Sequence, residues 1–163
     1  MAGNTNKVRR HCLLPQIAAA RRILVVTKFR FFGDSIVATP FLRKLHESCP
    51  QAKIDLLAGP SVAPVLENLP YLSEIIPFGS AQTLNLKDNL IMRKRLHLRG
   101  YNCAFILNRS LHSGLLIRGA HIPCRIGYNT EHRGFLLDVK IPYEYNKSEL
   151  DCCQDILRAT GIE

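Results

Sequence analysis

The sequence has no long apolar run. None of its 163 residues belongs to a stretch approaching the roughly 18 to 20 apolar residues that a helix needs to cross a bilayer. Its composition, 47% hydrophobic and 21% charged, is instead typical of a globular chain of single-domain size that buries a real core. The sequence therefore argues against both a membrane-spanning protein and a disordered one.

Several signatures of cofactor chemistry are also missing. Neither the dinucleotide pattern Gly-x-Gly-x-x-Gly nor the phosphate-loop Gly-Lys-Ser/Thr follows the first expected strand, which argues against dehydrogenases and P-loop enzymes. The six cysteines include no Cys-x-x-Cys pair, and His121 and Cys124, although spaced like two ligands, have no second pair nearby. We therefore expect no metal and no cofactor, and reduced thiols in a cytoplasmic protein.

Acidic residues are scarce relative to basic ones. There are 22 Lys and Arg against 13 Asp and Glu, a net charge of +9, which favours anionic partners such as phosphorylated sugars or an anionic membrane surface. Nucleic acid is not expected, because RNP-like aromatic motifs, a helix-turn-helix pattern and zinc ligands are all absent. The basic clusters at 7–10 and 93–99 are interpreted either as solvated faces or as peripheral contacts with the inner face of the cytoplasmic membrane.

Short apolar segments alternate with segments of helical periodicity. Strands are expected at 22–27, 53–59, 73–78, 102–108 and 124–128. Helices are expected at 36–48, 61–70, 83–98, 110–120 and 147–161. This alternation predicts βαβ units and a Rossmann-like, doubly wound parallel sheet.

The same pattern divides the chain into three parts. Residues 1–20 are expected to be a flexible basic extension, 21–143 the Rossmann-like domain, and 144–163 a closing helix. In such sheets ligands bind where strands run into helices, so the segments 28–35 and 108–113 are candidate site loops, together with 128–134.

One stretch carries a family resemblance. The segment "ILVVTKFRFFGDSIVATPFLRKLHESCPQAKIDLLAGP" resembles the start of the lipopolysaccharide heptosyltransferases of glycosyltransferase family 9, and looks closest to the heptosyltransferase III type. Looser matches follow at "NRSLHSGLL", "RIGY" and "RGFLL". The resemblance implies the N-terminal, acceptor-binding half of a two-domain GT-B glycosyltransferase. The donor ADP-heptose would be bound mainly by a second domain that this chain lacks, with residues 144–163 leading toward it.

The resemblance also implies a reaction. A heptose would pass from the nucleotide-sugar donor to the anionic, lipid-linked saccharide of the lipopolysaccharide inner core, with inversion at the anomeric carbon. Asp34 occupies the position of the family's general base, which takes the proton of the weakly nucleophilic acceptor hydroxyl. From the residues alone, Asp34 could equally cap the helix that follows. A non-catalytic Rossmann-like module that binds an anionic saccharide or nucleotide is the alternative function.

Acceptor contacts are expected from cations and a glycine in the candidate loops. Gly33 would allow close backbone approach or a positive φ, and the planar guanidinium of arginine matches carboxylate and phosphate groups. The alternative for the loop cations is solvated charge. The predicted acceptor-binding residues are Lys28, Arg30, Gly33, Arg109, Arg125 and Arg133.

Overall fold

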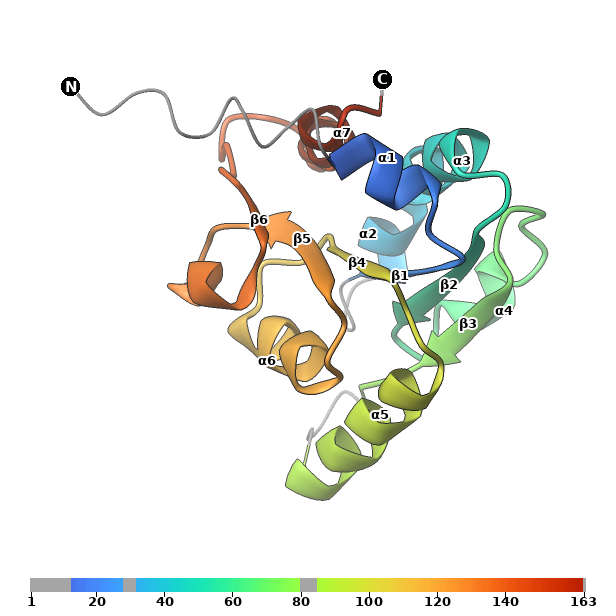
Figure 1. The fold of residues 1–163 in the computed structure, drawn as a ribbon, viewed down its shortest axis with the longest axis vertical. Helices are drawn as coiled ribbons and strands as arrows, with labels where there is room; N and C mark the ends of the chain where they lie inside the picture. The colour runs from blue at the N-terminus through green and yellow to red at the C-terminus, as the bar shows by residue number, and fades with distance from the viewer. Residues whose placement is uncertain (1–12, 28–31, 80–84, 163) are drawn as a thin grey trace.

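The protein is a parallel sheet with helices on both faces (Figure 1). The computed structural model describes residues 13–27, 32–79 and 85–162. The strands are β1 (Arg22–Val26), β2 (Lys53–Ala58), β3 (Glu74–Pro77), β4 (Cys103–Ile106), β5 (Cys124–Tyr128) and β6 (Val139–Ile141). Their order is β3-β2-β1-β4-β5-β6 and every pairing is parallel. The predicted doubly wound, Rossmann-like fold is confirmed, because this order is the one that such folds adopt.

The helices divide between the two faces of the sheet. They are α1 (Leu13–Ala18), α2 (Phe32–Val37), α3 (Thr39–Ser48), α4 (Ala63–Leu66), α5 (Leu86–Leu98), α6 (Leu111–Gly119) and α7 (Glu149–Thr160), with a 3-10 helix at Arg133–Leu136. Side chains of α1, α3 and α7 fill one core cluster, whereas side chains of α5 and α6 fill the other. The buried strands alternate accordingly: Ile23 and Val25 face the first cluster, and Leu24 and Val26 the second.

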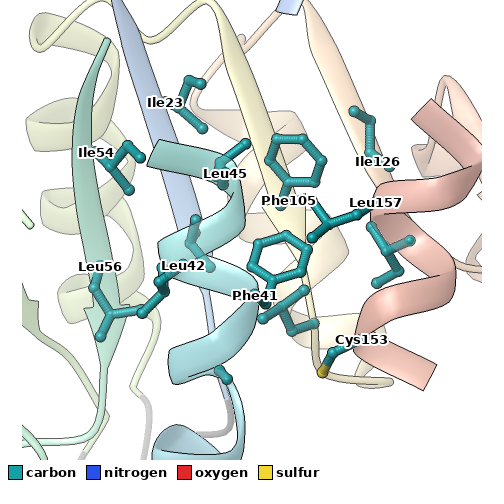
Figure 2. Close-up of a cluster of buried hydrophobic side chains, with 14 of the residues drawn as sticks. Ile23, Phe41, Leu42, Leu45, Ile54, Leu56, Phe105, Ile126, Cys153 and Leu157 are labelled. Atoms are coloured by element: carbon teal, nitrogen blue, oxygen red, sulfur yellow. The ribbon is translucent and has the colours of Figure 1, made fainter. Parts of the chain in front are cut away.

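The first cluster is built around α3 (Figure 2). Phe41, Leu42 and Leu45 point from α3 onto the sheet and are fully buried. Phe41 meets Phe105 of β4 edge to face, with ring centroids 5.4 Å apart, and Leu157 of α7 lies beside them. Aromatic pairs of this geometry add about 0.5–1.5 kcal/mol beyond the area that they bury.

The expected single helix over 36–48 is in fact two helices. It breaks at Ala38, where α2 ends and α3 begins. Pro40 lies in the first turn of α3, a position that suits proline because the amide it lacks would have no partner there. Thr39 and Pro40 therefore begin a helix of their own.

Both end segments of the described chain belong to the domain. The expectation of a flexible extension fails for residues 13–20, because Ile17 and Ala20 are buried in the first core cluster. The closing helix α7 packs on the same sheet through Ile156 and Leu157, so it completes this domain's core. Residues before 13 lie outside the described part of the chain. None of the described helices has the length and apolar character needed to cross a membrane.

Candidate functional site

The candidate site lies where β1 and β4 end. The two strands are neighbours, yet the chain continues from β1 to α2 and α3 on one face and from β4 to α6 on the other. This divergence is the topological switch point at which doubly wound sheets bind their ligands. Of the three expected site loops, 108–113 and 128–134 are described completely and 28–35 only from residue 32.

A buried polar cluster joins the elements at the switch point. The Ser35 hydroxyl of α2 donates to Thr27 Oγ1 at 3.2 Å. Asn108 Nδ2 donates to the Thr27 carbonyl at 3.0 Å and to Ser113 Oγ of α6 at 2.8 Å. All four side chains are at most 3% exposed, so each needs these partners to avoid an unsatisfied polar group. The cluster therefore fixes the first turns of α2 and α6 relative to each other.

Gly33 and Asp34 lie in the first turn of α2. Asp34 is the third residue of this helix, so it does not occupy the N-cap position considered for it. Gly33 is exposed and its φ is not positive, so a left-handed backbone does not explain the glycine at this position. A Cβ built on Gly33 would meet no atom of the described residues within 4 Å, so the alternative of close ligand approach stays a prediction. Lys28 and Arg30 lie outside the described residues.

Arg133 is buried completely and is held by the backbone. Its Nε donates to the Tyr128 carbonyl and its Nη1 to the Ser110 carbonyl, each at 2.8 Å, while Nη2 donates to the Asn108 carbonyl. Burial lowers the pKa of this guanidinium, and the nearby Glu131 carboxylate offsets part of that effect. Arg133 thus ties the loops after β4 and β5 together, and it does not reach the surface.

Arg125 lies at the opposite end of β5 from the candidate loop. It is the second residue of the strand, and its side chain is 8% exposed overall. Its guanidinium donates to the carbonyls of Ile122 and Leu136 and to Asp138 Oδ1 at 3.0 Å. The structure therefore does not bring Arg125 together with the other predicted site residues.

Arg109 differs from both of these arginines. It follows β4 directly at the switch point, and its guanidinium carbon lies 4.5 Å from the ring centre of Tyr143 and 5.6 Å from that of Tyr145. Within the described ranges, the Arg109 side chain makes no hydrogen bond and no ion pair. Sequence reasoning missed the two tyrosines, since nothing in the local pattern "PYEY" shows that it meets the loop after β4.

The loop between β5 and the 3-10 helix is tightly constrained. Glu131 and His132 have left-handed φ values of 50° and 56°, and Glu131 Oε2 accepts from the Leu111 amide at 2.9 Å. A Cβ on Gly134 would lie 2.3 Å from Asn129 Oδ1, so any other residue there would require the Asn129 side chain to shift. Across the described residues, no group of three or more His, Cys, Asp or Glu side chains is placed to hold a metal ion.

Comparison with known proteins identifies the family to which the chain belongs. No family model matches the chain. It is 31% identical over 122 residues to lipopolysaccharide heptosyltransferase 2 of Escherichia coli K12 and 30% identical to that of Salmonella typhimurium LT2. The chain is a heptosyltransferase-like protein. The matched regions cover 74% of this chain but only 35% of either relative, so the heptosyltransferase-like chain spans about a third of their length.

Solved structures agree with the relationship. The E. coli ADP-heptose lipopolysaccharide heptosyltransferase II matches with a TM-score of 0.67 at 25% identity, over 86% of this chain and 39% of that one. A family 9 glycosyltransferase from Veillonella parvula matches with a TM-score of 0.79 at 19% identity, over 88% of this chain and 42% of that one. The resemblance of this heptosyltransferase-like chain to family 9 is confirmed. Its likeness to the heptosyltransferase III type in particular stays a prediction.

Proposed function

We propose that this chain is the acceptor-binding half of a GT-B glycosyltransferase that transfers heptose from ADP-heptose to the lipopolysaccharide inner core. The observation that carries the proposal is the place of Gly33-Asp34. The sequence that resembles family 9 most specifically runs through this pair, and the pair lies at the switch point in the first turn of α2. The relatives named as heptosyltransferases support the type of sugar transferred.

In this proposal Asp34 is the general base. Its carboxylate takes the proton of an acceptor hydroxyl while that oxygen bonds to the anomeric carbon of the heptose. The bond from the anomeric carbon to the diphosphate breaks at the same time, ADP leaves as an anion, and the configuration at the anomeric carbon inverts. No metal is required of this chain. The donor would be held by a second domain, within the part of the relatives' length that this chain does not span, and the reaction would take place in the cytoplasm.

Replacement of Asp34 tests the proposal. In the two-domain protein, Asp34→Ala should lower turnover by about 100-fold or more, as expected for the loss of a general base. Acceptor affinity should change much less, because the carboxylate acts mainly in the transition state. ADP release from ADP-heptose in the presence of purified core acceptor measures turnover.

Asp88 offers a matched control, since it is the third residue of α5 just as Asp34 is of α2. Asp88→Ala should leave turnover unchanged. Normal turnover in folded Asp34→Ala would remove the base from the proposal. A wild-type protein that bound the saccharide but released no ADP would fit the alternative, a non-catalytic binding module.

A further inference from the structure

Three aromatic residues form a ladder at the edge of the sheet where the strands end. Tyr128 closes β5, and Tyr143 and Tyr145 follow β6. The rings of Tyr128 and Tyr143 meet edge to face with centroids 5.0 Å apart, and those of Tyr143 and Tyr145 with centroids 4.9 Å apart. The ladder runs from a fully buried ring, Tyr128, to a residue that is 77% exposed, Tyr145. A large aromatic face is therefore presented to solvent on a rigid support.

Arg109 reaches the same place from β4. Its guanidinium stacks on Tyr143, and its backbone is fixed because the Thr130 hydroxyl donates to the Arg109 carbonyl at 3.1 Å. The Tyr143 hydroxyl donates to Glu149 at 2.9 Å, which fixes the ring beneath the guanidinium. Stacking leaves the edge of the guanidinium open, and that edge carries the donors that match a carboxylate or phosphate.

The acidic residues around this position are engaged elsewhere. Glu131 accepts from the Leu111 amide, Glu144 from Lys147, and Glu149 from Tyr143. Among the described residues no carboxylate pairs with Arg109, although ion pairs form on other faces of the domain, as between Arg43 and Glu47. The Arg109 cation is therefore held in place by stacking, and none of the described carboxylates pairs with it.

We propose that Arg109, Tyr143 and Tyr145 form a subsite for a sugar ring that carries a carboxylate or phosphate group. The anionic group binds the edge of Arg109, and the C–H face of the ring packs on Tyr145. This inference rests on the proposed function for the identity of the ligand as a saccharide, and it goes further by naming the residues and the charge of the unit that they select.

Ligand-observed NMR on this chain tests the subsite without any donor. Glucuronic acid and glucose 6-phosphate supply a ring with a carboxylate or a phosphate, methyl glucoside a neutral ring, and inorganic phosphate an anion without a ring. We expect saturable binding of at least one charged sugar and about tenfold weaker binding of methyl glucoside and of inorganic phosphate, because ring and anion contribute separately. The tighter of the two charged sugars identifies the anionic group.

Variants assign the binding to these residues. Arg109→Gln should weaken the binding of the charged sugar by about tenfold or more, since a bidentate charged contact is lost. Tyr145→Ser should also weaken it, whereas Tyr145→Phe, which keeps the ring, should not. Arg118→Gln is the matched control, because Arg118 is exposed on the neighbouring helix α6 and its loss changes the net charge equally. Far-UV circular dichroism checks that each variant is folded.

Equal binding of the charged sugar by the wild type and Arg109→Gln would overturn the proposal. Inorganic phosphate that binds as tightly as the charged sugars would overturn the sugar-ring part, as would unchanged binding by Tyr145→Ser. These results are independent of the transfer reaction. If the two-domain protein transfers heptose but Arg109→Gln binds the charged sugar normally, the subsite alone is refuted. If the protein binds anionic sugars through Arg109 but transfers no heptose, the proposed reaction alone is refuted.

Discussion

Arg133 shows how a protein can bury a cation with backbone carbonyls as its hydrogen-bond partners. Three backbone carbonyls from two loops accept hydrogen bonds from its guanidinium, and those of Tyr128 and Ser110 also accept from the amides of Thr130 and Gly114. Because these carbonyls belong to the segments around the ends of β4 and β5, the residue stabilises the geometry of the candidate site, and its side chain does not reach the surface. Its contribution should therefore appear in stability.

We predict that Arg133→Met lowers the free energy of unfolding by about 3 kcal/mol or more, the usual cost of breaking a buried polar network. Urea unfolding followed by far-UV circular dichroism measures it. Arg43→Met removes an exposed i,i+4 pair with Glu47 and should cost less than about 1 kcal/mol. An equal loss of unfolding free energy in the two variants would show that the buried Arg133 network stabilises the fold no more than an exposed ion pair does.

Residue roles were the least predictable part of the site. The predicted set treated Arg109, Arg125 and Arg133 alike, although Arg109 and Arg133 fall in expected loops and Arg125 falls in an expected strand. What separates them is the number of carbonyl and carboxylate oxygens that other segments bring to each guanidinium, and that number depends on tertiary structure. The place of Arg125 could have been predicted, since it is the second residue of a strand and therefore far from the end where ligands bind.

Among the helices, α5 has an unusual outer surface. At 100° per residue, the positions opposite its buried Met92 and Leu96 are occupied by Lys87, Leu90, Ile91, Lys94 and Leu98. Leu90, Ile91 and Leu98 are each more than half exposed, at 53%, 57% and 74%. Exposed aliphatic side chains interleaved with lysines are typical of helices that lie on membrane surfaces. In Figure 1 α5 projects from the body of the domain.

We predict that α5 draws the domain to anionic vesicles. Replacing Lys87 and Lys94 with Gln should weaken co-sedimentation by about tenfold or more, because each cation near such a surface contributes about 1 kcal/mol. Raising the salt concentration should weaken the binding of the wild type. A control with Lys53→Gln and Lys140→Gln, both exposed outside α5, should bind like the wild type. Vesicle binding that depended neither on anionic lipid nor on salt concentration would refute this prediction. The second predicted cluster, 7–10, lies outside the described residues.

Elements were predicted well where one segment determines its own structure. Continuous apolar runs predicted the ends of β1 to β5 to within one or two residues, because burial on both faces gives a strand a continuous apolar sequence. The short edge strand β6 was not expected. Ser110 caps α6, its hydroxyl accepting from the His112 amide at 3.2 Å, and Gly100 closes α5 with a φ of 66°. The break at Ala38 was missed because the helical spacing of apolar residues continues across it. The 3-10 helix before β6 was missed because it is too short to show any periodicity in the sequence.

At the scale of the whole molecule, the proposed division of acceptor and donor binding between two domains determines how tightly this chain should bind the donor. We predict that this chain alone transfers no heptose and binds ADP-heptose with no better than millimolar affinity. Acceptor and donor must be held together for reaction, and such positioning can be worth about 7–11 kcal/mol of the barrier. Calorimetric titration of the chain with ADP-heptose is the direct measurement. Micromolar binding would place the donor site on this domain and contradict the proposed division.

The pairing of β1 with β4 also dictates an order of assembly. β1, β2 and β3 are consecutive in the chain and can pair as soon as residue 77 is made, whereas β4 joins β1 across about 80 residues of sequence. Closing so large a loop is entropically costly, so this pairing limits the folding rate more than the local ones do. The switch point exists only once that step is complete. In a nascent chain, β1, β2 and β3 can therefore pair well before the ligand site at the switch point forms.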